Sequence, residues 1–152
     1  MRKPALLLII ISALLFAGCK APRQRAPRPD GPPKSDVDFA REVFQRMGDG
    51  DLDVAQLLDW ENLTMAGVDV GAQYRNVSGD SGREIFQDSF LKGYSKSFKS
   101  AGGNTSALNN WREQSKDSTN TVVAGDLPNG QTLLITVTHT NGLQYVSSVQ
   151  AK

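Results

Sequence analysis

Few residues of this chain have a type and spacing that could carry out chemistry. Its 152 residues include one cysteine, Cys19, and one histidine, His139. A single cysteine cannot form a disulfide within the chain, and zinc or haem sites are usually built from clusters of cysteine and histidine. The sequence therefore predicts no metal site of this kind, and we expect no cofactor.

Carboxylates, phenols and the histidine are the remaining groups that could transfer a proton. A carboxylate becomes a base near neutral pH when burial raises its pKa. Asp69 lies between two valines, and Tyr74, Tyr94 and His139 are further candidates. His139 is expected near the end of a strand, at the mouth of a hairpin, where a surface role is favoured over catalysis. Asp69 and His139 remain the candidate catalytic residues, and no motif of a known hydrolase or phosphate-binding loop accompanies them.

Three alternating aspartates, Asp49, Asp51 and Asp53, have the spacing of a calcium-binding loop, which supplies oxygen ligands at alternate positions. The rest of the EF-hand pattern is missing, because Val54 stands at the glycine position and Trp60 at the position of the last glutamate. The segment is therefore predicted to end one helix and to cap the next.

Charge divides the chain into two unlike parts. Residues 1–34 carry seven basic side chains and one acidic side chain, whereas residues 35–152 carry 10 basic and 15 acidic ones. A domain that binds nucleic acid needs a basic face, so the acidic second part argues against that function. Its length fits one small domain.

The first 18 residues have the composition of a signal peptide. Met1-Arg2-Lys3 is a positive start, and residues 5–16 form an apolar run that is shorter than the roughly 20 residues needed to span a bilayer. This length argues against a transmembrane anchor.

The sequence Leu15-Phe16-Ala17-Gly18-Cys19 resembles the lipobox of bacterial lipoprotein precursors, although Phe16 stands where leucine is commonest. In that family the signal peptide is cut before the cysteine, whose sulfur receives a diacylglyceryl group. The resemblance implies lipidation of Cys19 with fatty acyl chains such as palmitate, and hence a membrane anchor. Lys20 replaces the aspartate that commonly retains lipoproteins in the inner membrane, which favours the outer membrane, facing the periplasm, if the source is Gram-negative. A secretory signal cut near a free cysteine is the alternative.

Residues 19–34 are predicted to form a tether after the lipidated cysteine. The segment contains five prolines and no large apolar residue, so it cannot form a core of its own. In extended form, residues 20–34 could hold the domain up to about 45 Å from the membrane. The segment is either a solvated spacer or a cationic contact for anionic lipid head groups.

Residues 35–152 are predicted to form a single α+β domain. Apolar residues recur at helical spacing after Ser35, in a shorter stretch over 53–60, and after Ser81, which is the expected cap of a third helix. Alternating segments then predict strands over 108–115, 121–126, 131–140 and 143–149. Asn141-Gly142 predicts a two-residue hairpin in which Thr140 pairs with Leu143, Thr138 with Tyr145, and Val137 with Val146. We expect two or three helices packed on a curved antiparallel sheet of about four strands.

This order of elements, and the ending Asn141-Gly142-Leu143-Gln144-Tyr145-Val146, resemble the cone-shaped nuclear-transport-factor-two-like superfamily, which includes SnoaL-like enzymes. The resemblance implies a sheet curled around a pocket, which serves catalysis in some members and binding in others. An unrelated α+β roll or a cystatin-like arrangement remains an alternative.

The function that the sequence favours is an envelope lipoprotein whose domain binds a small ligand or a protein partner without catalysis. The alternatives are a SnoaL-like pocket enzyme that uses Asp69 or His139 for proton transfer or isomerisation, and an accessory subunit of an envelope secretion or transport assembly. No nucleic-acid partner is expected.

Overall fold

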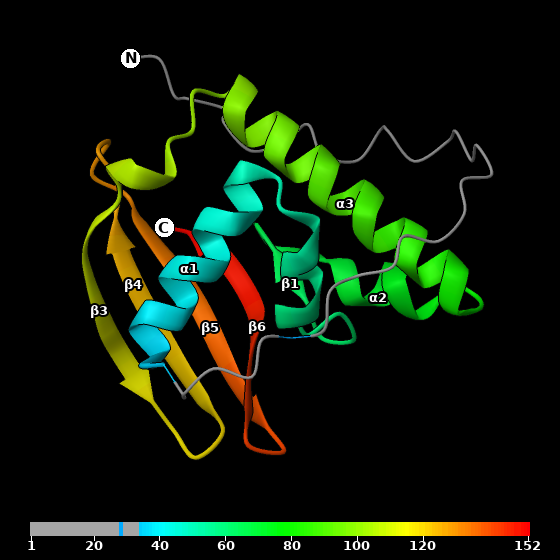
Figure 1. Cartoon of the computed structure of the whole chain (residues 1–152). Coiled ribbons are helices and arrows are strands. Elements are labelled where there is room, and N and C mark those ends of the chain that lie inside the picture. The colour runs from blue at the N-terminus through cyan, green and yellow to red at the C-terminus, as the bar shows by residue number, and fades with distance from the viewer. Residues whose placement is uncertain (1–27, 29–33) are drawn as a thin grey trace.

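The computed structural model describes Arg28 and residues 34–152, so the predicted signal peptide, Cys19 and most of the tether lie outside the described residues. The described chain begins with helices and ends with strands (Figure 1). Its helical elements are α1 (Asp36–Asp49), η1 (Leu52–Leu57), α2 (Val70–Arg75), α3 (Asp80–Ser100) and η2 (Thr105–Ala107). Its strands are β1 (Thr64–Met65), β2 (Val68–Asp69), β3 (Asn109–Lys116), β4 (Asn120–Asp126), β5 (Thr132–Thr140) and β6 (Leu143–Ala151).

Helix α1 starts and stops where its sequence predicts. Ser35 is the N-cap, and its Oγ accepts a hydrogen bond from the backbone N–H of Asp38 at 3.1 Å. Gly50 ends the helix in a left-handed conformation, with φ of 85°, which glycine adopts without steric cost. The apolar face of α1 is buried through Phe39, Ala40, Val43, Phe44 and Met47.

The alternating aspartates end α1 at Asp49 and cap η1 at Asp51, as predicted. Asp51 is the N-cap of η1: its Oδ1 accepts the backbone N–H of Asp53 at 2.9 Å, and its Oδ2 lies 2.7 Å from Nε of Arg46. The element that follows is a 3₁₀ helix, shorter than the helix predicted over 53–60. Helix α3 begins at Asp80 after Gly79, so the prediction that Ser81 caps it is wrong.

The sheet has six strands in the order β2-β1-β6-β5-β4-β3. All neighbours are antiparallel except β1 and β6, which run parallel, so the sheet is mixed. The domain is α+β, but the prediction of two or three helices on a curved antiparallel sheet of about four strands is wrong, because the sheet is mixed and has six strands. The described residues instead hold three α-helices, two 3₁₀ helices and six strands. Strands β1 and β2 have two residues each, which is too short for alternation to show in a sequence. The resemblance to the nuclear-transport-factor-two-like superfamily stays a prediction.

The C-terminal hairpin has the predicted register. Thr140 pairs with Leu143, Thr138 with Tyr145, and Val137 with Val146. Asn141 and Gly142 both have positive φ, 52° and 76°, as a two-residue type I′ turn requires. Beyond Val137 a bulge shifts the register, which sequence alternation does not reveal.

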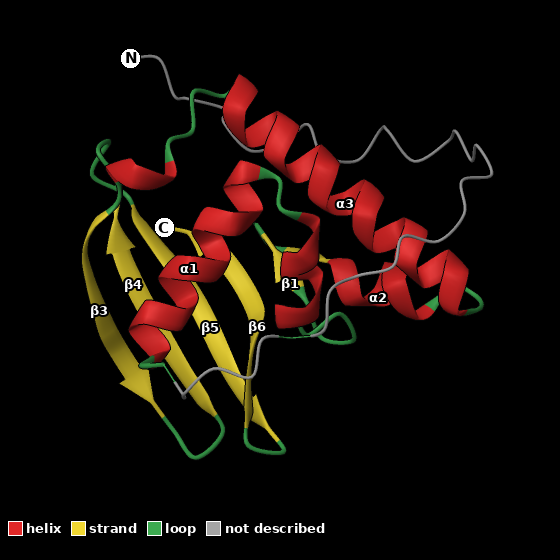
Figure 2. Ribbon diagram, viewed as in Figure 1, coloured by secondary structure: helices red, strands yellow, loops and turns green. Residues whose placement is uncertain are grey.

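The two faces of the sheet differ in chemistry. The inward side chains of β5, namely Leu133, Ile135 and Val137, belong to the hydrophobic core. Helix α1 packs across this face in contact with β3 to β6, and α3 packs on α1 and η1 (Figure 2). The opposite face carries hydroxyl groups, among which Thr138 Oγ1 lies 2.7 Å from Ser147 Oγ. One core cluster extends from Phe39 to Val149, so these elements bury a common interior.

Candidate functional site

A buried carboxylate lies at the end of the sheet where α1 begins. Asp36 is the first residue of α1, and only 8% of it is exposed to solvent. Because Ser35 caps the helix immediately before it, the Asp36 side chain falls in the first helical turn, where a negative charge is favoured by the helix dipole. Helix packing over the sheet places this carboxylate against the strands.

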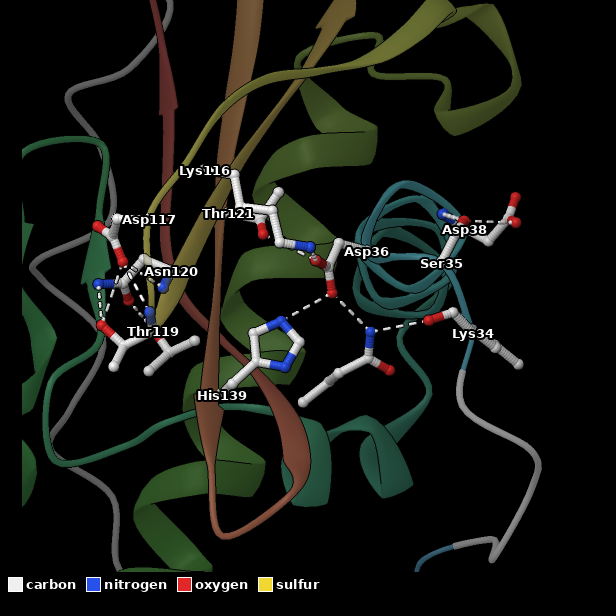
Figure 3. A network of polar contacts seen from close by, with 12 residues as sticks. Lys34, Ser35, Asp36, Asp38, Lys116, Asp117, Thr119, Asn120, Thr121 and His139 are labelled. Carbon is white, nitrogen blue, oxygen red and sulfur yellow. Dashed lines mark hydrogen bonds and ion pairs between the residues drawn. The ribbon is translucent and has the colours of Figure 1, made fainter.

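Four side chains, each from a different strand, approach the two oxygens of Asp36 (Figure 3). Oδ2 accepts hydrogen bonds from Thr121 Oγ1 at 2.7 Å and from Lys116 Nζ at 3.2 Å. Oδ1 accepts one from Gln144 Nε2 at 2.7 Å, and His139 Nε2 lies 2.9 Å from it. We call Asp36, Lys116, Thr121, His139 and Gln144 the Asp36 cluster.

The members of the cluster differ in their access to solvent. Thr121 is fully buried, so its hydroxyl depends on Asp36 for a hydrogen bond. The Lys116 side chain is 53% exposed and that of His139 is 37% exposed. Nε2 of His139 is shielded from solvent and makes no hydrogen bond within the described residues, and its contact with Asp36 is an ion pair only when the histidine is protonated. The cluster is therefore closed on the Thr121 side and open to water at Lys116.

The surroundings of Asp36 decide its ionisation. Burial by itself raises the pKa of the Asp36 carboxyl, because it penalises the charged form. Hydrogen bonds from Thr121, Gln144 and Lys116, together with the charge of His139, outweigh burial and hold the pKa of Asp36 below its ordinary value. Asp36 is therefore an anion at neutral pH.

This arrangement supports a structural role better than a catalytic one. A histidine oriented by a carboxylate can pass a proton to or from a substrate. A carboxylate that acts as a base itself needs a pKa raised toward neutrality, and Asp36 is shifted the other way. Its oxygens are also occupied by donors from the protein. The cluster instead fastens the first turn of α1 to four strands.

The sequence-predicted candidates Asp69 and His139 are not brought together. Asp69 lies on β2, which is three strands away from β5 in the sheet order, or about 14 Å at the usual strand spacing. Its side chain is 58% exposed, and its Oδ1 caps α2 by accepting the backbone N–H of Ala72 at 2.8 Å. Arg75 forms an ion pair with it at 3.7 Å. Asp69 thus serves as a helix cap.

The two candidate tyrosines are core residues. The Tyr74 ring packs 5.8 Å from that of Trp60, and its hydroxyl accepts a hydrogen bond from Gln87 at 3.3 Å. Tyr94 is stacked on Phe98 at 6.0 Å, and burial raises the pKa of the Tyr94 phenol. A phenol with a raised pKa stays neutral at physiological pH.

Two open surface depressions lie away from the Asp36 carboxylate. One, of about 330 Å³, is lined by Tyr74 and four polar or charged residues of α3, namely Asp80, Arg83, Glu84 and Gln87. The other, of about 400 Å³, runs along the start of α1 and is lined by Lys34, Asp38, Arg41, Glu42 and Gln45. Both have largely charged linings, as expected of solvated surface.

Within Arg28 and residues 34–152, no group of three or more histidine, cysteine, aspartate and glutamate side chains is arranged to hold a metal ion. No described helix has the length and apolar character needed to cross a membrane.

The alternation along β4 and β5 carries a signal for the Asp36 cluster. Thr121 and His139 occupy the same alternate positions as the inward residues Val123 and Val137. Polar residues on an apolar face, near one end of a sheet, indicate a buried polar cluster. Gln144 then follows from the hairpin register, because it pairs with His139. The acidic partner, Asp36, has no such strand signal, because it directly follows Ser35 at the start of the first predicted helix.

Comparison of the chain with protein-family models, with curated proteins and with solved structures finds no match.

Proposed function

We propose that this protein is a lipid-anchored lipoprotein of a bacterial cell envelope, and that its domain binds a small ligand or a protein partner without catalysing a reaction. The observation that carries the proposal is the order of features in residues 1–19: a positive start, an apolar run too short to span a bilayer, small residues and then Cys19. Lys20 after the cysteine favours the outer membrane in a Gram-negative source.

The start of the domain supports a tethered arrangement. Lys34 lies next to the N-cap of α1, and its carbonyl oxygen accepts a hydrogen bond from Gln144 Nε2 at 3.0 Å. The Asp36 cluster then fastens α1 to the sheet. A pull on the N-terminal segment would therefore be transmitted to four strands rather than to one helix end.

The lowered pKa of Asp36 supports the non-catalytic part of the proposal. The donors around this carboxylate are provided by the protein, so it has little remaining capacity to bind a substrate proton. The hydroxyl groups of the outward sheet face offer a surface that could contact a polar partner. There Thr64 Oγ1 donates to Ser148 Oγ at 2.8 Å, and Thr138 Oγ1 donates to Asn120 Oδ1 at 2.9 Å.

The anchor is tested by Cys19→Ser and membrane fractionation. We expect the wild-type protein in the membrane fraction, labelled by a palmitate analogue. The Cys19→Ser protein should carry no label and should not be found as a processed protein in the membrane fraction. Separation of inner from outer membranes tests the location. A processed Cys19→Ser protein that stays in the membrane would contradict the lipid anchor.

Partner binding is tested by affinity capture of the tagged protein from solubilised membranes. We expect either one stoichiometric protein partner or a small molecule that native mass spectrometry detects. A protein partner would include the case in which this chain is an accessory subunit of an envelope assembly. Thr136→Lys places a charge on the outward sheet face and should abolish the association. The matched control Ser100→Lys, at the exposed end of α3, should leave it unchanged. Equal capture by both variants would exclude the outward face as the binding surface.

A further inference from the structure

Arg28, in the predicted tether, is in contact with the last strand of the domain. Its Nη2 donates a hydrogen bond to the backbone carbonyl of Gln144 at 2.6 Å. The centre of its guanidinium lies 4.6 Å from the centroid of the Tyr145 ring, close enough for a cation–π interaction. The Arg28 side chain is half-buried, and its Nη1 is shielded from solvent. Arg28 is therefore packed against β6.

Gln144 holds the N-terminal segment at two places. Its backbone carbonyl accepts from Arg28, while its side-chain Nε2 donates to the carbonyl of Lys34 at 3.0 Å and to Asp36 Oδ1 at 2.7 Å. The five residues 29–33 that connect these contacts include three prolines. Prolines restrict the chain before it docks, which lowers the entropy lost when the segment is fixed at both ends.

The edge of β6 explains why the contact forms there. On the side away from β5, β6 pairs with Leu58 at Val146 and with β1 at Ser148 and Val149. Within the described residues, the stretch Leu143–Tyr145 has no strand partner on that side. An open strand edge leaves backbone groups without partners, and a charged side chain that covers it satisfies one of them.

We infer that the domain binds its own tether, with Gln144 and Tyr145 as the docking point for Arg28. Docking at Arg28 leaves residues 20–27, and not residues 20–34, as the spacer between the predicted anchor and the domain. At the rise of an extended proline-rich chain, its reach falls from about 45 Å to about 25 Å. Two of the basic residues are also engaged by the domain, since Lys34 forms an ion pair with Glu42.

The docking also fixes which end of the domain is nearest the anchor. Arg28 meets β6 near the β5–β6 hairpin, whose residue Leu143 is 43% exposed. The C-terminal end of α3 lies at the opposite end of the domain (Figure 1). The docked tether therefore turns the hairpin toward the membrane. This orientation rests on the proposed lipid anchor, whereas the docking of Arg28 does not.

The docking is tested by nuclear magnetic resonance of the isotope-labelled full chain in detergent micelles, with the side-chain Nε–Hε signal of Arg28 as the readout. Arg28→Ala identifies the signal. We expect a ring-current shift and slow hydrogen exchange in the wild type, both lost in Tyr145→Leu. The matched control Arg25→Ala removes the same charge from the tether and should leave the Arg28 signal unchanged. The docking would be overturned if the Arg28 signal of the wild type had the chemical shift and exchange rate of an unstructured arginine and did not change in Tyr145→Leu.

The orientation is tested in vesicles that carry an acceptor dye on the lipid head groups. A donor dye is attached at Leu143→Cys or at Ala101→Cys, which follows the end of α3. We expect more energy transfer from position 143 than from position 101, and loss of that difference in Arg28→Ala. Equal transfer from both positions in the otherwise wild-type chain would overturn the orientation.

These results separate the two proposals. If Cys19→Ser shows that no lipid anchor exists while the Arg28 signal is shifted and protected, the proposed function fails and the docking stands. If the anchor exists and the Arg28 signal is that of an unstructured residue, the docking alone fails.

Discussion

The two ends of α1 are held to the domain by different interactions. Toward its C-terminus, Phe44 lies 5.7 Å from Phe98 and 6.4 Å from Trp111, and Met47 is fully buried. At its N-terminus, Asp36 is held by hydrogen bonds and charge. Apolar packing depends on volume and area and has no preferred direction. Hydrogen bonds fix direction, and those to a carboxylate also depend on its protonation. The comparison shows how one helix can be positioned by packing at one end and oriented by polar contacts at the other.

The largest effect is expected at the apolar end. Phe44→Ala removes a buried aromatic ring from the cluster with Phe98 and Trp111, and should lower the free energy of unfolding by about 3–5 kcal/mol. Chemical denaturation of the full chain measures this change. Arg41→Ala, on an exposed part of the same helix, should cost less than about 0.5 kcal/mol. Similar losses in the two variants would show that the packing of α1 contributes little.

The polar end is expected to contribute less, but still measurably. Asp36→Ala leaves the buried Thr121 hydroxyl without its partner and removes the acceptor of Gln144, so we expect a loss of about 2–3 kcal/mol. The matched control is Asp38→Ala, two residues along the same helical turn, where the side chain is 55% exposed. It should cost less than about 1 kcal/mol. Equal losses of stability in the two variants would show that Asp36 contributes no more than an ordinary helix-capping residue.

The stability that the two ends of α1 contribute should differ in its dependence on pH. The folded pKa of Asp36 is lowered, so the unfolded chain binds more protons in acid and stability rises with pH in that range. The contribution of Asp36 is full above its unfolded pKa, near 4, and is lost as the pH falls through its lower folded pKa. The stability difference between wild type and Asp36→Ala should therefore shrink below about pH 4, whereas that between wild type and Phe44→Ala should stay constant. A difference for Asp36→Ala that does not change with pH would contradict the lowered pKa.

The smallest effect is expected at the solvent-exposed member of the cluster. Lys116→Ala removes an ion pair whose lysine side chain is 53% exposed, and should cost less than about 1 kcal/mol. The loss should diminish further in high salt, which screens exposed charges. Thermal unfolding at low and high salt measures both effects. A loss as large as that of Asp36→Ala would mean that Lys116, and not Thr121 and Gln144, provides most of the stability of the cluster.

The fold could be predicted from the sequence where periodicity is long and turn chemistry is strong. Asn141-Gly142 predicts the hairpin and its register, which the pairing of Thr138 with Tyr145 confirms. Strands β1 and β2 could not be predicted, because two residues carry no period and the parallel pairing of β1 with β6 depends on the tertiary arrangement. The four-stranded prediction failed at that edge of the sheet.

The candidate site was predicted less well than the fold. His139 was identified as an ionisable residue near a strand end, and it lies beside Asp36. No local pattern marks Asp36 as part of a site, because the strand residues that surround it are 80 or more positions away along the chain. Sequence alternation shows which strand residues point inward, but it does not show which of them meets a helix end.

The hydrogen bond between Asp36 and Gln144 joins residues 108 positions apart, and the one between Arg28 and Gln144 spans 116 positions. A ribosome makes the helical part of the chain first and β6 last. Contacts of such long range form late in folding, because the loop that they close loses the most chain entropy. The N-terminal end of the domain is thus completed only after its final strand has been synthesised. A chain truncated before Leu143 would keep Thr121 and Lys116 but lack Gln144, which binds both Asp36 and the carbonyl of Lys34.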